Sequence, residues 1–163
     1  METGLSQRLP LIDKGRCGEL ETAIYLTLAP WRGLLPRDAL APRQVEALGQ
    51  RRWDLLALTP EGAPVTGTVV CRLLLAPGDW GPLGGIQAER VVTYGLSPRD
   101  SLTLSSLTEP VLCVQRHLPR PDGAVIEPQE FPLPSLPGPP EELLPLLGLR
   151  LLLMPLAEPP FLW

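Results

Sequence analysis

The chain has 163 residues, and we expect a single domain over residues 1–163. Hydrophobic residues make up 44% and charged residues 20%, a composition of folded proteins rather than disordered ones, while 22 prolines and 15 glycines predict many turns and short elements. The net charge of −4 and a pI near 5.0 provide no basic field that would attract nucleic acid, so no nucleic-acid partner is expected.

The first quarter of the chain carries weak signals. Residues 1–20 have no clear periodicity and are predicted to form an irregular arm. The β-rich run Thr22–Leu28 predicts a strand. A helix is expected from residue 41 or 42 to Arg51, because Pro42 suits a first helical position and glutamine, glutamate, alanine and leucine follow it.

The middle of the chain predicts buried parallel strands. Trp53–Thr59 and Thr66–Ala76 are apolar runs bounded by turn residues, a pattern typical of strands covered on both faces. Arg72 inside the second run must find a partner or an edge, because an unpaired buried charge is costly. Residues 77–85 predict a loop, and Val91–Tyr94 predicts a further strand.

Three short β segments then predict an antiparallel meander. Ser101–Leu107 alternates apolar and polar residues, and Val111–Leu118 and Ala124–Phe131 follow after turns. Asp122-Gly123 is among the strongest hairpin signals. Pro128 cannot donate a ladder hydrogen bond, so the last segment is expected to be an edge strand.

The C-terminal region is rich in proline and leucine. Residues 132–140 predict a stiff proline-rich linker within the domain. Glu141 and Glu142 are expected to open a short helix, and Leu149–Leu156 is expected to close as a strand. The apolar stretch from residue 143 to 157 is broken by proline, glycine and arginine, and it falls short of the roughly 20 apolar residues that span a bilayer. We therefore expect no membrane contact.

Together these elements predict an α/β fold. It consists of one domain with few helices and a mixed sheet, which has a buried parallel part and a C-terminal antiparallel meander.

Scarcities in the composition exclude several chemistries. His117 is the single histidine and Lys14 the single lysine, so a site with two histidine ligands is impossible and a phosphate loop would need Lys14. Cys113 and His117 lie on one predicted strand, roughly 13 Å apart at 3.3 Å per residue, too far for a catalytic dyad. The three cysteines form no C-x-x-C pair, and without a signal peptide they indicate reduced thiols in a cytoplasm. No catalytic residue, metal ligand or cofactor is predicted.

Four residues are candidates for contact with a ligand or partner. Asp79, Tyr94 and Asp100 follow or end predicted strands, and open α/β sheets bind ligands at the carboxyl ends of their strands. Trp80 lies between glycine-rich neighbours in the loop, where an exposed tryptophan would suit an interface and a tryptophan folded over the core is the alternative.

Residues 70–131 resemble the late part of the middle domain of Mur ligases. The segment Leu73–Asp79 matches a strand with an acidic turn, Arg90–Ser97 matches the following strand, and the meander comes next. The core YGLSPRDSLTLSS also resembles small proteins of Firmicutes, which suggests a bacterial source. The phosphate loop, modified lysine and metal-binding histidine and glutamate of Mur ligases have no counterpart here, nor does their C-terminal domain. The resemblance therefore implies fold without catalytic machinery.

From these observations we expect a non-catalytic cytoplasmic binding or scaffold protein that acts on a protein partner or by self-association. The candidate surfaces are residues 132–140, Phe161–Trp163 and the loop around Trp80. The alternative is a small nucleotide- or UDP-sugar-binding protein or an enzyme of the Mur ligase type.

Overall fold

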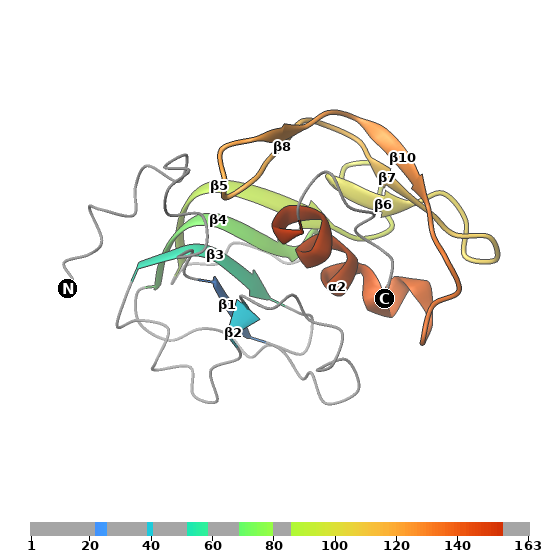
Figure 1. The fold of residues 1–163 in the computed structure, drawn as a ribbon, viewed down its shortest axis with the longest axis horizontal. Coiled ribbons are helices and arrows are strands. Elements are labelled where there is room, and N and C mark those ends of the chain that lie inside the picture. The colour runs from blue at the N-terminus through green and yellow to red at the C-terminus, as the bar shows by residue number, and fades with distance from the viewer. Residues whose placement is uncertain (1–21, 26–38, 41–51, 59–68, 80–85, 155–163) are drawn as a thin grey trace.

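The described part of the chain is a mixed β-sheet with one α-helix on it, which confirms the α/β prediction (Figure 1). The structure is a computed structural model, and it describes residues 22–25, 39–40, 52–58, 69–79 and 86–154. The strands of the main sheet are β1 (Thr22–Tyr25), β2 (Ala39–Leu40), β3 (Arg52–Leu58), β4 (Val69–Pro77), β5 (Ile86–Tyr94), β6 (Leu102–Leu104), β7 (Val111–Val114) and β10 (Gln129–Pro132). A small second sheet joins β8 (Leu118–Pro119) to β9 (Val125–Ile126), and the helix is α2 (Pro140–Leu153).

The main sheet has the order β10-β7-β6-β5-β4-β3-β1-β2. Neighbours from β2 to β6 are parallel, and β6, β7 and β10 pair antiparallel. The predicted parallel part and the predicted meander are therefore both present. From Trp53 onward every residue of β3 is buried, as the continuous apolar run predicts for a strand covered on both faces.

The step from β5 to β6 is short for a parallel connection, which ordinarily needs a dozen or more residues. It is possible because the two strands share a single register pair, Tyr94 with Leu102. Strand β6 starts beside the end of β5, so the loop between them only has to bring Leu102 back next to Tyr94.

The meander differs from its prediction in three places. Of the predicted segment Ser101–Leu107, only Leu102–Leu104 forms a strand. Val111–Leu118 is not one strand, because β7 ends at Val114 and β8 starts at Leu118. Ala124–Phe131 is divided by Pro128 into β9 and β10. The Asp122-Gly123 turn closes the β8–β9 hairpin, and β10 is the edge strand that Pro128 predicts.

The predicted strand at Leu149–Leu156 is wrong, since α2 continues to Leu153. Pro145 and Gly148 suggest a break, but neither ends the helix. Pro145 deprives only the carbonyl of Glu141 of a helical donor, and Glu141 is an exposed residue in the first turn. Residues 143–152 are all buried, so packing outweighs the weak local propensity.

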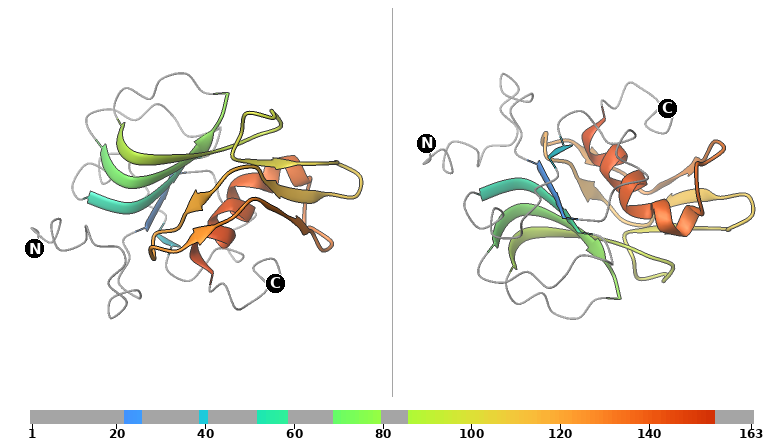
Figure 2. Two further views of the ribbon diagram at one scale, coloured as in Figure 1. Left: turned by 90° about the horizontal axis from the view of Figure 1, so that it is seen from above. Right: turned by 90° about the horizontal axis from the view of Figure 1, so that it is seen from below.

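Gly148 lies where α2 packs against the sheet. A Cβ built there would lie 3.1 Å from side-chain carbons of both Leu75 and Leu102. The missing side chain thus allows close packing of the helix on the sheet. Figure 2 shows from above and from below how α2 lies along the sheet.

Replacing Gly148 with valine is expected to destabilise the chain by about 2 kcal/mol, in the range for overpacked cores. The added methyl groups must push Leu75 or Leu102 out of contact. Urea unfolding measures the change. An unaltered midpoint would show that the helix can move away from the sheet without loss.

The apolar side chains of the sheet divide into two clusters. The helix-side cluster joins α2 to the sheet and to the β8–β9 hairpin, and it includes Leu55, Leu75, Leu102 and Leu118. The opposite cluster gathers around Trp53 and other side chains of β3 and β4. Arg72, within β4, has the partner that the sequence requires, because its Nε lies 3.8 Å from the carboxylate of Glu89.

Residues 133–139 connect β10 to α2 within the proline-rich segment 132–140. Leu133 and Leu136 pack against the helix-side cluster, while Pro134 between them is exposed. The predicted helix over 41–51, the arm over 1–20 and the surface Phe161–Trp163 lie outside the described residues. In the part of the chain that the structure covers, no helix has the length and apolar character needed to cross a membrane.

Candidate functional site

The candidate site lies at the carboxyl ends of β4 and β5, where open α/β sheets bind their ligands. The amide of Gly78 donates to the carbonyl of Tyr94 at 2.9 Å, and the amide of Gly95 donates to the carbonyl of Leu102 at 3.1 Å. These bonds bring the chain around Asp79 and the loop that carries Asp100 to one edge of the sheet. Three of the four predicted residues therefore lie in one region.

Tyr94 is part of the protein's own framework. Its side chain is buried, with 4% of its surface exposed, and its hydroxyl donates to the carbonyl of Leu58 at 2.7 Å. This bond ties the end of β5 to the end of β3, across β4. The hydroxyl thus links two strand ends that are not neighbours in the sheet.

Replacing Tyr94 with phenylalanine is expected to lower the unfolding free energy by about 1–2 kcal/mol, because the buried carbonyl of Leu58 loses this donor. Thermal melting of both chains checks the value. Equal melting temperatures of the variant and the wild type would contradict a stabilising role for this hydrogen bond.

Asp100 is a buried carboxylate lodged between two glycines. One of its oxygens accepts from the amide of Ser97 at 3.1 Å, and 5% of the residue is exposed. A Cβ built on Gly78 would lie 1.6 Å from Oδ1, and one built on Gly95 would lie 2.4 Å from Oδ2. Only glycine at both positions leaves room for the carboxylate.

The turn Ser97-Pro98-Arg99-Asp100 sets the position of this carboxylate. The amide of Asp100 donates to the carbonyl of Ser97 at 3.0 Å, and the amide of Arg99 donates to the hydroxyl of Ser97 at 3.1 Å. Proline at the second position suits such a turn. The sequence pattern thus identifies the turn, whereas the contact with Gly78 depends on the fold.

Asp79 and Trp80 complete the candidate set. Asp79 is exposed in the turn after β4. Trp80 lies outside the described residues. Asp79 is therefore the one described candidate whose side chain faces solvent, and a ligand-binding role for any of the four stays a prediction.

Among the described residues, the two free thiols belong to different strands, Cys71 to β4 and Cys113 to β7. Burial, with a smaller effect of the Glu89 charge, raises the pKa of Cys71 to about 12, so this thiol is unreactive. Burial and the charge of Glu130 also raise the pKa of Cys113. His117 is exposed beyond the end of β7. The residues covered by the structure contain no group of three potential metal ligands.

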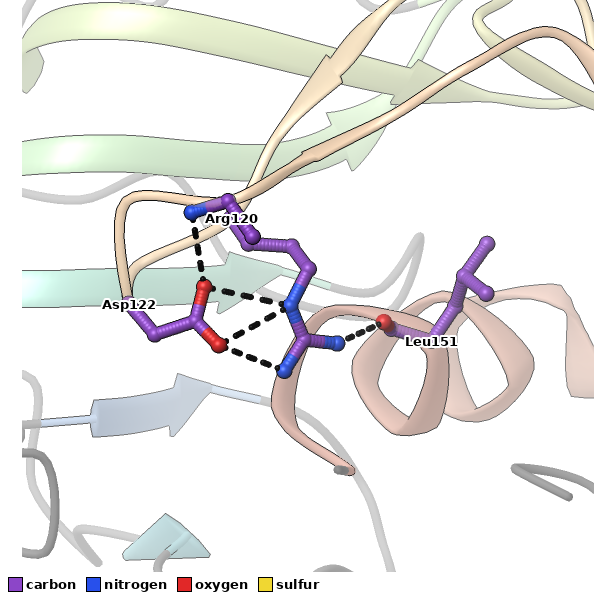
Figure 3. Close-up of polar contacts among 4 residues, drawn as sticks. Arg120, Asp122 and Leu151 are labelled. Carbon is purple, nitrogen blue, oxygen red and sulfur yellow. Dashed lines mark hydrogen bonds and ion pairs between the residues drawn. The ribbon is translucent and has the colours of Figure 1, made fainter. Parts of the chain in front are cut away.

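A second polar cluster, which sequence reasoning missed, joins the β8–β9 hairpin to α2 (Figure 3). Arg120 has 3% of its side chain exposed and donates from Nη2 to the carboxylate of Asp122 at 2.9 Å. Its Nη1 donates to the carbonyl of Leu151 at 2.7 Å. That carbonyl belongs to the last turn of the helix, where a cation also suits the helix dipole.

The carboxylate of Asp122 is held by several donors. Burial alone would raise its pKa, but the hydrogen bonds from Arg120 and from the amide of Ala124, with the charge of Arg120, outweigh burial and lower the pKa. The Asp122-Gly123 pattern predicts the hairpin but carries no signal for its contact with a helix that starts 17 residues later.

Comparisons with protein-family models, curated proteins and solved structures find no match to this chain.

Proposed function

We propose that the chain is a non-catalytic cytoplasmic binding or scaffold protein, related in fold to part of the Mur ligase middle domain, which acts through contact with a protein partner. One observation carries the proposal: the buried polar groups at the carboxyl ends of the strands form hydrogen bonds within the protein itself. The hydroxyl of Tyr94 and the carboxylate of Asp100 both bond to the protein's own backbone.

These internal hydrogen bonds argue against a catalytic role for Tyr94 and Asp100 at the carboxyl ends of the strands. A general base or a nucleophile needs a reactive atom within hydrogen-bond reach of a substrate. The two buried groups serve the strand ends and the turn instead, and the buried thiol of Cys71 has a raised pKa. The exposed side chains of the edge then serve contact rather than reaction.

The kinship with Mur ligases is supported by the order of elements. A buried strand with an acidic turn at Asp79, a parallel strand ending at Tyr94 and an antiparallel meander follow one another, as the resemblance implies. Cytoplasmic location is supported by the free thiols of Cys71 and Cys113.

One observation favours the alternative, a nucleotide- or UDP-sugar-binding protein. Asp79 is an exposed carboxylate at the carboxyl end of β4, where ligands of open α/β sheets bind.

Thermal melting with ATP-magnesium and with UDP-N-acetylglucosamine tests the choice, with Asp79→Asn as the matched variant. A ligand at 100 times its dissociation constant stabilises a folded protein by about 2.7 kcal/mol, which is about 5–10 °C for a chain of this size. We expect no rise with either compound. A rise in the wild type that Asp79→Asn abolishes would replace the proposed function with the alternative.

A further inference from the structure

Two segments next to the candidate site form one exposed surface. The loop after β5 presents Leu96 and Arg99, and the segment after β7 presents Arg116 and His117. We call these four residues the arginine patch. The two segments lie side by side, because Nη1 of Arg116 donates to the carbonyl of Arg99 at 2.5 Å.

The backbone beneath the patch is held in one conformation. The side-chain nitrogen of Gln115 donates to the carbonyls of Pro98 and Asp100 at 3.1 and 2.7 Å. The backbone amide of Gln115 donates to the carbonyl of Ser101 at 2.9 Å. The reciprocal bonds between Ser97 and Asp100 close the loop from the other side. A surface that is ordered before binding loses less entropy when a partner arrives.

The two arginines of the patch have no counter-charge within the part of the chain that the structure describes. There, carboxylates pair with Arg52, Arg72 and Arg120, and none pairs with Arg99 or Arg116. Two exposed arginines on adjoining segments are thus available on a chain with a net charge of −4. Each retains donors suited to a carboxylate, and arginine is enriched where interfaces gain most of their energy.

Leu96 adds an apolar contact to this charge. Its exposed fraction is 57%, and it precedes the turn that carries Arg99. We propose that the arginine patch binds an acidic segment of a partner protein, with Leu96 against an apolar side chain of that segment. This inference rests on the proposed protein-binding function and names the chemistry of the partner.

A nucleic acid fits the patch less well. Its affinity comes from several phosphate contacts at once, whereas the patch offers two arginines. A short acidic peptide needs only the two arginines and one apolar contact.

Fluorescence anisotropy on the full chain tests the proposal. The probe is a labelled nine-residue peptide with one central leucine flanked by four glutamates on each side, and the control peptide carries glutamines instead. We expect saturable binding of the acidic probe below about 1 mM, no binding of the control, and weaker binding as salt rises from about 50 to 300 mM because screening increases.

Two matched pairs of variants assign the binding to the patch. Arg99→Gln combined with Arg116→Gln keeps hydrogen-bond donors and removes both charges, and we expect at least fivefold weaker binding. Arg90→Gln, at an exposed arginine within β5, is expected to leave binding unchanged. Leu96→Ser should weaken binding by a few fold, whereas Leu107→Ser, which alters another exposed leucine, should not.

Three results would overturn the proposal: no saturable binding of the probe, equal effects of the patch and control variants, or tighter binding of a ten-residue thymidine oligonucleotide. These results do not bear on the melting experiment with nucleotides. The melting experiment can therefore contradict the proposed function even if the patch binds the probe. The anisotropy experiment can contradict the role of the patch without contradicting the proposed function.

Discussion

Replacing Gly78 with alanine is expected to destabilise the chain by about 3 kcal/mol, at the upper end for overpacked sites. The new methyl carbon would lie 1.6 Å from Oδ1 and 2.8 Å from Cγ of Asp100. The backbone itself does not forbid alanine, because Gly78 has no positive φ. The whole cost therefore arises from the contact with one carboxylate, which is buried and bonded to the amide of Ser97.

A double-mutant cycle isolates this contact. Asp100→Ala alone is expected to cost about 1–2 kcal/mol, because the amide of Ser97 loses its acceptor. Combined with Gly78→Ala it should cost clearly less than the sum of the two single changes, with a coupling of about 2 kcal/mol. Urea unfolding of the four chains gives the coupling, and strict additivity would show that Asp100 does not lie against Gly78.

Gly123→Ala serves as the control for the cycle. Gly123 has a φ of 90°, so alanine there is strained by the backbone rather than by a neighbouring side chain. Its cost is expected to stay the same in the presence and absence of Asp100→Ala. Rescue at Gly78 but not at Gly123 would assign the effect to the carboxylate.

The parts of this fold that the sequence predicts are those with local causes. Apolar runs bounded by turn residues identify β3 and β4, and proline at the second position identifies the turn at 97–100. Pro128 predicts the edge strand from its missing donor. Each of these signals lies within the segment that it describes.

The parts that the sequence does not predict depend on contacts between distant segments. In the sequence Gly148 resembles a helix breaker. In the fold, Leu75 and Leu102 pack against it and leave little space for a side chain. Asp100 is predicted as a candidate for ligand contact, but the sequence carries no signal for its contact with Gly78. For the same reason Arg116 attracts no notice in the sequence and becomes part of a surface only beside the carbonyl of Arg99.

The second large effect is expected at Asp122. Asp122→Asn keeps an oxygen for the amide of Ala124 and removes the charge, so the guanidinium of Arg120 stays buried without a counter-charge. We expect a loss of about 3 kcal/mol, as for other broken buried pairs. Arg120→Met should cost less, about 1–2 kcal/mol, because it removes the buried charge itself and leaves a carboxylate that is 33% exposed and can be hydrated.

The ranking of these two variants in urea unfolding tests the cluster, and the double variant should cost less than the sum. A larger loss for Arg120→Met than for Asp122→Asn would mean that the bond to the carbonyl of Leu151 outweighs the ion pair.

The same carboxylate makes stability depend on pH. The pKa of Asp122 is lower in the folded chain than its ordinary value, so the folded state favours the ionised form. This contribution is fully present above the ordinary aspartate pKa of about 3.9 and disappears as pH falls through the lower value of the folded chain. The difference in unfolding free energy between the wild type and Asp122→Asn should therefore be constant from about pH 7 to pH 5 and should shrink below about pH 4. A difference that grows toward low pH would mean that the carboxylate is easier to protonate in the folded chain, contrary to the contacts with Arg120 and Ala124.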